Sequence, residues 1–158
     1  MGRGEQPVNN SMTGALVAGL EAGILAVLAL LGWLALASAW YRHSIWTAAN
    51  IMATTFYGEV ALRPDFNFRT VAGIALYVVL YGAIGALFGL AVTSRRSLRI
   101  TLIGMLVGLG WYYLSFNLLW RNFDPLIILY THPAPMVAGH VLYGGLLGRF
   151  PRYLEPHA

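Results

Sequence analysis

Long apolar segments constrain this sequence more than any other feature. From Thr13 to Ala37 the chain carries a single charged residue, Glu21. A helix needs about 20 residues to cross the hydrocarbon core of a bilayer, so this segment is long enough to span it. Three further apolar segments follow at residues 70–93, 100–119 and 125–150, the last of them beginning at Pro125 or Pro133. The sequence therefore predicts an all-α, polytopic membrane protein with four transmembrane helices.

The composition agrees with a lipid environment. Of the 158 residues, 58% are hydrophobic and 10% are charged, whereas ordinary globular domains carry about 25% charged residues. So few charged side chains cannot cover a soluble domain of this size. Cysteine and lysine are both absent, which excludes disulfides, thiolate metal sites and cysteine nucleophiles. The arginines stand singly or in short groups between apolar segments, which indicates topology signals rather than a nucleic-acid surface.

The segments outside the spans suggest one transmembrane domain with short polar ends. We expect residues 1–12 to form a disordered cytoplasmic lead and residues 151–158 a cytoplasmic tail, around a single domain at 13–150. A signal peptide cleaved near Ala37 is the rival interpretation of the first span. That span is longer than the roughly 7–15 residues of a signal peptide core and contains a carboxylate, so we favour a retained helix.

The connection between the first two spans is too long for a simple turn. Within it, residues 44–57 are mostly apolar and predict a short helix in the outer interface. We place Trp46, Asn50, His43 and His132 at this outer interface. Glu59, Asp65 and Asp124 supply further polar groups there.

Arginine positions predict the orientation of the chain. In the four-span scheme, more arginines fall on the side of the termini than on the opposite side. The positive-inside rule then places both termini in the cytoplasm. The first group comprises Arg3, Arg95, Arg96, Arg99, Arg149 and Arg152, and the second Arg42, Arg63, Arg69 and Arg121.

Each predicted span carries two glycines four residues apart. Such glycines share one helix face and let another helix backbone approach closely. We therefore expect tight helix packing, although a pocket for a quinone, a pigment or a lipid tail between the helices is an alternative. The pairs are Gly19 with Gly23, Gly85 with Gly89, Gly104 with Gly108, and Gly144 with Gly148.

Two ionisable residues lie inside the predicted spans. Counted at 1.5 Å per residue, Glu21 and His140 both lie about 12–14 Å from the same side of a core about 30 Å thick. Charged groups in hydrocarbon are costly unless they face the bundle interior and find partners. We therefore predict a polar cluster in which the two pair, with Tyr143 and Tyr81 as further members. A structural role in helix register, a proton or cation path, and a ligand site remain open for it.

Signatures of catalysis and of metal binding are absent from the sequence. There is no hydrolase serine motif, no metalloprotease motif, no phosphate-binding glycine loop and no closely spaced carboxylate pair. His43 and His132 are candidates to ligate a metal or haem jointly, but isolated interfacial histidines are commoner. We predict no catalytic residues, no metal and no cofactor.

Two motifs resemble a known family. Trp46 and Asn50 lie in the segment 44–53, and His140 and Tyr143 lie in the glycine-rich segment 139–148. They resemble a widespread family of small, uncharacterised four-helix prokaryotic membrane proteins, in which Trp-x-x-x-Asn follows the first helix and His-x-x-Tyr-Gly-x-x-x-Gly ends the last. The resemblance covers residues 14–150 and implies this fold and a cell-membrane location, but no activity. Members often have a histidine where this chain has Tyr77, and this departure weakens a metal or haem site built on a histidine pair.

These observations favour a structural or accessory membrane component. Its expected partners are the lipid bilayer and either further copies of itself or a larger membrane complex, with no nucleic acid. A proton- or cation-linked conduit using Glu21 and His140 is the first alternative. A binder of a lipid-soluble cofactor, quinone or haem, is the second.

Overall fold

In the computed structural model, residues 12–92 and 97–149 are described, and the regular structure in this part of the chain is entirely helical. The predicted all-α class is therefore confirmed. The expected lead and tail lie outside the described residues, except for Met12. The elements in chain order are α1 (Met12–Arg42), α2 (Thr47–Tyr57), the 3-10 helix η1 (Gly58–Ala61), α3 (Phe68–Ala91), α4 (Ser97–Leu114), the π-helical η2 (Ser115–Leu119), α5 (Trp120–Phe123), α6 (Pro125–Tyr130) and α7 (Pro133–Leu147).

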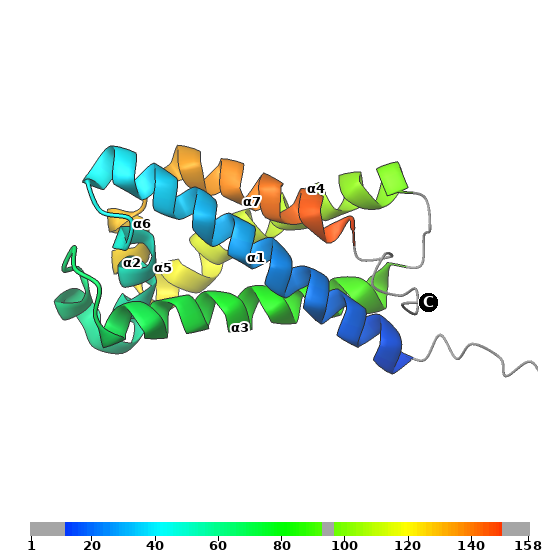
Figure 1. The fold of residues 1–158 in the computed structure, drawn as a ribbon, viewed down its shortest axis with the longest axis horizontal. Coiled ribbons are helices and arrows are strands. Elements are labelled where there is room, and N and C mark those ends of the chain that lie inside the picture. Colours follow the sequence, from blue (N-terminus) through cyan, green and yellow to red (C-terminus); the bar gives the residue numbers. More distant parts are fainter. Residues whose placement is uncertain (1–11, 93–96, 150–158) are drawn as a thin grey trace, which may run out of the picture.

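The body of the molecule consists of α1, α3, α4 and α7, which extend along its long axis (Figure 1). α1 packs against α3 and α7, and α4 packs against α7. The short helices α2, α5 and α6 gather at one end, which we call the short-helix end. The first residues of α1 and α4 and the last residues of α3 lie toward the opposite end. The chain thus makes two hairpins, α1 with α3 and α4 with α7, each connected through short helices.

In the described part of the chain, three helices are long and apolar enough to cross a membrane, which is one fewer than predicted. They are α1, α3 and the continuous helical stretch Ser97–Phe123. The fourth predicted span is divided at Thr131 and His132 into α6 and α7, because Pro133 lacks the N–H that a continuous helix would need. α7 has 15 residues and is therefore about 22 Å long, shorter than a hydrocarbon core of about 30 Å.

The short helix expected between the first two spans is present as α2. It packs against α3 and α1, and six consecutive residues from Ala49 to Thr54 are buried. Asn50 joins it to the segment that follows, since its amide Nδ2 donates to the backbone carbonyls of Arg63 and Asp65. Thr70 on α3 donates from Oγ1 to Asn50 Oδ1 at 2.7 Å. One buried amide thus connects α2, the following loop and α3.

Local sequence sets the start of α3. The side chain of Asn67 accepts from the backbone N–H of Arg69 at 2.9 Å, and the Thr70 hydroxyl accepts from the backbone N–H of Asn67 at 3.0 Å. This reciprocal capping box satisfies donors that the first turn of a helix leaves unpaired. Because Thr70 also contacts Asn50, the cap of α3 and the attachment of α2 depend on each other.

α1 and α3 cross where two glycines of each helix face one another. A Cβ added to Gly85 would lie 2.5 Å from the carbonyl oxygen of Gly19 and 2.6 Å from Cα of Gly23. A Cβ added to Gly19 would lie 2.9 Å from Cα of Gly89. These neighbours are backbone atoms, so no side-chain rotation relieves the overlap. The two helices can approach this closely only because glycine has no Cβ.

α4 and α7 cross in the same way. A Cβ added to Gly104 would overlap the carbonyl oxygen of Gly144, and one added to Gly108 would overlap the carbonyl oxygen of His140. A Cβ added to Gly148 would lie 2.5 Å from Cα of Thr101. Each hairpin is therefore closed by a crossing of glycine pairs.

The outward surfaces of the long helices are apolar. Leu28 on α1, Val79 on α3 and Leu106 on α4 are each more than half exposed. Water does not stabilise so extensive an apolar surface, and contact with lipid does. This surface agrees with the membrane location indicated by the length and hydropathy of three helices.

Candidate functional site

His140 lies on α7 and is fully buried. Its Nδ1 lies 2.7 Å from the carbonyl oxygen of Met136, and its Nε2 lies 2.7 Å from the hydroxyl oxygen of Tyr81 on α3. A carbonyl oxygen can only accept, so a neutral ring with its proton on Nδ1 satisfies both contacts. In that form Nε2 accepts a hydrogen bond from the hydroxyl group of Tyr81. Both ring nitrogens of the buried histidine are therefore used within the bundle.

Tyr143 joins α7 to α3 a second time. Its hydroxyl donates to the backbone carbonyl of Tyr81 at 2.6 Å, and the two rings meet edge to face at 4.9 Å between centroids. We call Tyr81, His140 and Tyr143 the tyrosine–histidine cluster. The structure brings these three predicted residues together through two hydrogen bonds between α3 and α7.

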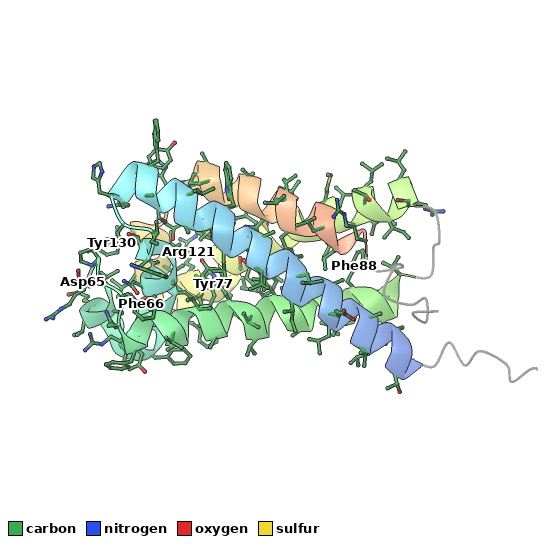
Figure 2. The ribbon with its side chains drawn as sticks, viewed as in Figure 1. Asp65, Phe66, Tyr77, Phe88, Arg121 and Tyr130 are labelled. Carbon is green, nitrogen blue, oxygen red and sulfur yellow. The ribbon has the colours of Figure 1, made fainter. Side chains whose placement is uncertain are left out.

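Aromatic rings from two helices surround this cluster. Tyr112 on α4 meets the His140 ring at 5.3 Å between centroids, and Trp111 meets the Tyr81 ring at 6.4 Å. Tyr77, labelled in Figure 2, lies one turn from Tyr81 on α3 with its ring centroid 5.7 Å away. α3, α4 and α7 thus meet around a histidine whose polar atoms are occupied, an arrangement suited to holding helices in register.

Glu21 does not belong to this cluster. It is exposed on α1, whose buried face carries Ala18, Ala22 and Ala26. Successive residues on a helix are rotated by about 100°, so Glu21 points away from the face that packs on α3 and α7. The structure therefore corrects the expected pairing of Glu21 with His140, whose side-chain partner is Tyr81 instead.

The depth of Glu21 also differs from the expected depth. Gly19 and Gly23, which flank it, face Gly85 and Gly89 near the end of α3. The partner of His140 is Tyr81, at least one turn farther from that end. Counting residues from the start of each span assumes that all helices start at one level, and α1 crosses α3 obliquely instead (Figure 1).

The four residues expected at the outer interface all lie at the short-helix end, in separate surroundings. Trp46 packs on Phe66 at 4.8 Å between ring centroids, and His132 stacks on Tyr41 at 4.9 Å. His43 follows α1 with a positive φ of 57°, so it turns the chain out of the helix. Asn50 is buried in the hydrogen bonds described above. Within residues 12–92 and 97–149, no three or more histidine, aspartate or glutamate side chains form a group that could hold a metal ion.

Asp124 organises the short-helix end to a degree that the sequence did not indicate. Its Oδ2 accepts from the hydroxyls of Thr54 at 2.6 Å and Thr55 at 3.3 Å, both on α2. Its Oδ1 accepts from the backbone N–H of Leu126 at 3.2 Å and so caps α6. The available signal was an aspartate directly before Pro125, since an acidic cap followed by proline is a common helix start. The two threonine contacts join residues about 70 positions apart and have no local signal.

We expect Asp124→Ala to lower the free energy of unfolding by about 1–2 kcal/mol, because it removes a helix cap and leaves the Thr54 hydroxyl without its carboxylate acceptor. Thermal unfolding of the detergent-solubilised protein, followed by circular dichroism, measures the change. Asp65→Ala is the control, because that exposed residue contributes its backbone carbonyl, and not its carboxylate, to the hydrogen bonds with Asn50 and Asn67. Equal stability of the two variants would contradict the role of Asp124.

Comparison with known proteins adds no further assignment. No protein-family model, curated protein or solved structure matches this chain. Over residues 12–92 and 97–149, the structure is that of a helical protein with three helices able to cross a membrane, two glycine crossings and a buried tyrosine–histidine cluster.

Proposed function

We propose that the protein is a structural or accessory component of a prokaryotic inner membrane and that it binds a partner subunit through the outward face of α1. The observation that carries this proposal is the position of Glu21. It is the single charged residue between Thr13 and Ala37, and its side chain is exposed rather than paired within the bundle.

The bundle interior supports a structural role. The hydroxyls of Tyr81 and Tyr143 and both nitrogens of His140 are engaged in hydrogen bonds with neighbouring groups of the same chain. A proton or cation conduit was expected to use Glu21 together with His140. Glu21 points away from the bundle interior and lies at a different depth from His140. The two side chains are therefore not in contact, and the conduit loses the residue pair on which it depended.

The outward face of α1 is apolar on both sides of Glu21. Val17 lies one turn before it and Leu25 and Leu28 follow it, and all three side chains are exposed. A charged side chain that faces hydrocarbon is costly unless it finds a partner. A partner helix that offers an arginine, lysine or other N–H donor at this level removes that cost. Charge complementarity therefore selects a basic or donor-bearing membrane helix as the occupant.

The arginines support a proposed orientation of the chain in the membrane. The end of the bundle opposite the short helices carries Arg99 near the start of α4 and Arg149 just after α7. Arg95 and Arg96 stand in the sequence between α3 and α4. By the positive-inside rule, we propose that this end faces the cytoplasm, with both chain termini on that side.

A site-directed photo-crosslink tests the partner. The chain contains no cysteine, so Val17→Cys can carry a benzophenone probe in native membranes, and Val79→Cys on the outward face of α3 is the matched control. We expect one discrete adduct from position 17 and none from position 79. Adding Glu21→Leu should reduce the yield at position 17 about tenfold or more, because the polar contact is lost.

Three outcomes contradict this proposal. The first is no discrete adduct at position 17, and the second is an adduct whose yield is unchanged by Glu21→Leu. The third is an adduct of twice the mass of the chain, which would show that a second copy, and not a different subunit, covers the face.

A further inference from the structure

Three adjoining hollows lie along the last turns of α1 at the short-helix end. The first, the polar cavity, has a volume of about 200 Å³ and is lined by Arg42, Thr47, Asn50, Ile51, Leu62, Pro64 and Tyr130. The second, the neck, has a volume of about 40 Å³ and shares Arg42, Thr47, Ile51 and Tyr130 with the polar cavity. The third, the aromatic groove, has a volume of about 400 Å³ and shares Ala37, Tyr41 and Pro135 with the neck. Neighbouring hollows share lining residues, and we call the three hollows together the path.

Arg42 is positioned to bind an anion in this path. It is the last residue of α1, and its guanidinium Nη2 donates to the carbonyl oxygen of Tyr130 at 3.3 Å. Tyr130 is labelled at the short-helix end in Figure 2. A guanidinium has five N–H donors. Among the described residues, that of Arg42 makes this one hydrogen bond. None of the described residues that line the three hollows is acidic, so an anionic ligand would meet no like charge from them.

A second polar group in the neck lacks a partner. The hydroxyl oxygen of Thr131 is buried and, among the described residues, is the one buried side-chain nitrogen or oxygen without a hydrogen bond. Thr131 also lines the neck. A buried hydroxyl without a partner is unfavourable, and an oxygen of a ligand in the neck would satisfy it.

The aromatic groove has the opposite character. Trp33, Leu36, Trp40 and Ala134 complete its lining. Trp33 donates its indole N–H to the carbonyl oxygen of Pro135 at 2.8 Å, so its one polar atom is already used. From Arg42 to Trp33 the distance along α1 is nine residues, or about 14 Å. A ligand that fills the path therefore has an anionic group at one end and an extended apolar chain at the other.

We infer that this path binds an anionic phospholipid, with its phosphate at Arg42 and one acyl chain in the aromatic groove. The geometry fits a lipid because Arg42 ends a helix able to span a membrane, while the groove runs back along that helix. A zwitterionic headgroup is disfavoured because its ammonium would find no carboxylate on these walls. This inference concerns the last turns of α1 and does not depend on the partner proposed at Glu21.

Tryptophan quenching by brominated lipids tests the inference. Purified protein is reconstituted in phosphatidylcholine vesicles that contain a small fraction of phosphatidylglycerol with brominated acyl chains. The comparison uses the same fraction of brominated phosphatidylcholine. We call the additional quenching by the anionic lipid over the zwitterionic lipid the excess quenching. We expect it to correspond to about a fivefold preference for the anionic lipid, which is the effect of one basic residue near a headgroup.

Variants separate this site from general attraction. Arg42→Gln should abolish the preference, and Arg42→Lys should retain it. Arg121 is exposed and lines none of the three hollows, so Arg121→Gln should leave the preference unchanged. Replacing Trp33 and Trp40 together with phenylalanine should remove the excess quenching. Circular dichroism of each variant confirms that the helices persist.

Four results would overturn the inference. One is equal quenching by the two lipids in the unmodified protein, and another is a preference that survives Arg42→Gln. A third is excess quenching that remains when Trp33 and Trp40 are both replaced. The last is loss of the preference on adding millimolar inorganic phosphate, which would identify a free phosphate rather than a lipid headgroup as the ligand.

Discussion

The Gly85→Ala variant is expected to lose about 3 kcal/mol of its free energy of unfolding, the upper range for overpacking a tight interior. The added methyl would lie 2.5 Å from the carbonyl oxygen of Gly19 and 2.6 Å from Cα of Gly23. Both are backbone atoms, so α1 and α3 must separate along the crossing. Thermal or denaturant unfolding in a mild detergent, followed by tryptophan fluorescence, measures this loss.

Two other glycines are matched controls for this prediction. A Cβ on Gly32 of α1 or on Gly110 of α4 would meet no atom within 4 Å. Alanine has a higher helix propensity than glycine, so Gly32→Ala and Gly110→Ala should be neutral or stabilising by up to about 1 kcal/mol. If Gly85→Ala were as stable as these two variants, the close approach of α1 and α3 would not be a source of stability.

Spacing along the chain predicted features that depend on one helix at a time. The four-residue spacing of Gly85 and Gly89 predicts that they share one packed face, and both are buried on α3. The span lengths of α1 and α3 followed from the number of apolar residues, since lipid contact imposes a minimum length. Both features follow from the geometry of a single helix and need no knowledge of its neighbours.

Features that depend on two helices were predicted less well. To place Glu21 relative to His140, one must know at which level α1 crosses α3. That level is set by which glycines of the two helices face one another. The sequence named Tyr81 and Tyr143 as cluster members but could not rank Tyr81 above Glu21 as the partner of the imidazole. A local count of residues assigns a depth to each side chain and does not assign a direction.

The division of the last predicted span shows what hydropathy alone does not predict. The predicted fourth span begins at Pro125 or Pro133, and both alternatives treat it as a helix that crosses the membrane. The structure ends α6 at Tyr130 and begins α7 at Pro133, so neither piece has the length of a spanning helix. Hydropathy averages over a window and does not register where the hydrogen bonds of a helix stop.

Replacing His140 with leucine is expected to destabilise the protein by about 2–3 kcal/mol, because it leaves the Tyr81 hydroxyl buried without its acceptor. Tyr81→Phe should cost less, because it removes a single hydroxyl, although Nε2 of His140 is then unpaired. If the two groups form one unit, the double variant should cost less than the sum of the single variants, with a coupling of about 1–2 kcal/mol. Equilibrium unfolding of the four proteins in the same detergent gives this double-mutant cycle.

The cycle distinguishes a specific bond from general loss of packing. Tyr113→Phe on α4 is the control, because Tyr113 is 70% exposed and removal of its hydroxyl should change stability by less than about 0.5 kcal/mol. Because the hydroxyl of Tyr81 and Nε2 of His140 lie 2.7 Å apart on different helices, their coupling measures how firmly α3 and α7 are joined. Strictly additive costs would show that each side chain acts through packing alone, and the cluster would then not hold these helices together.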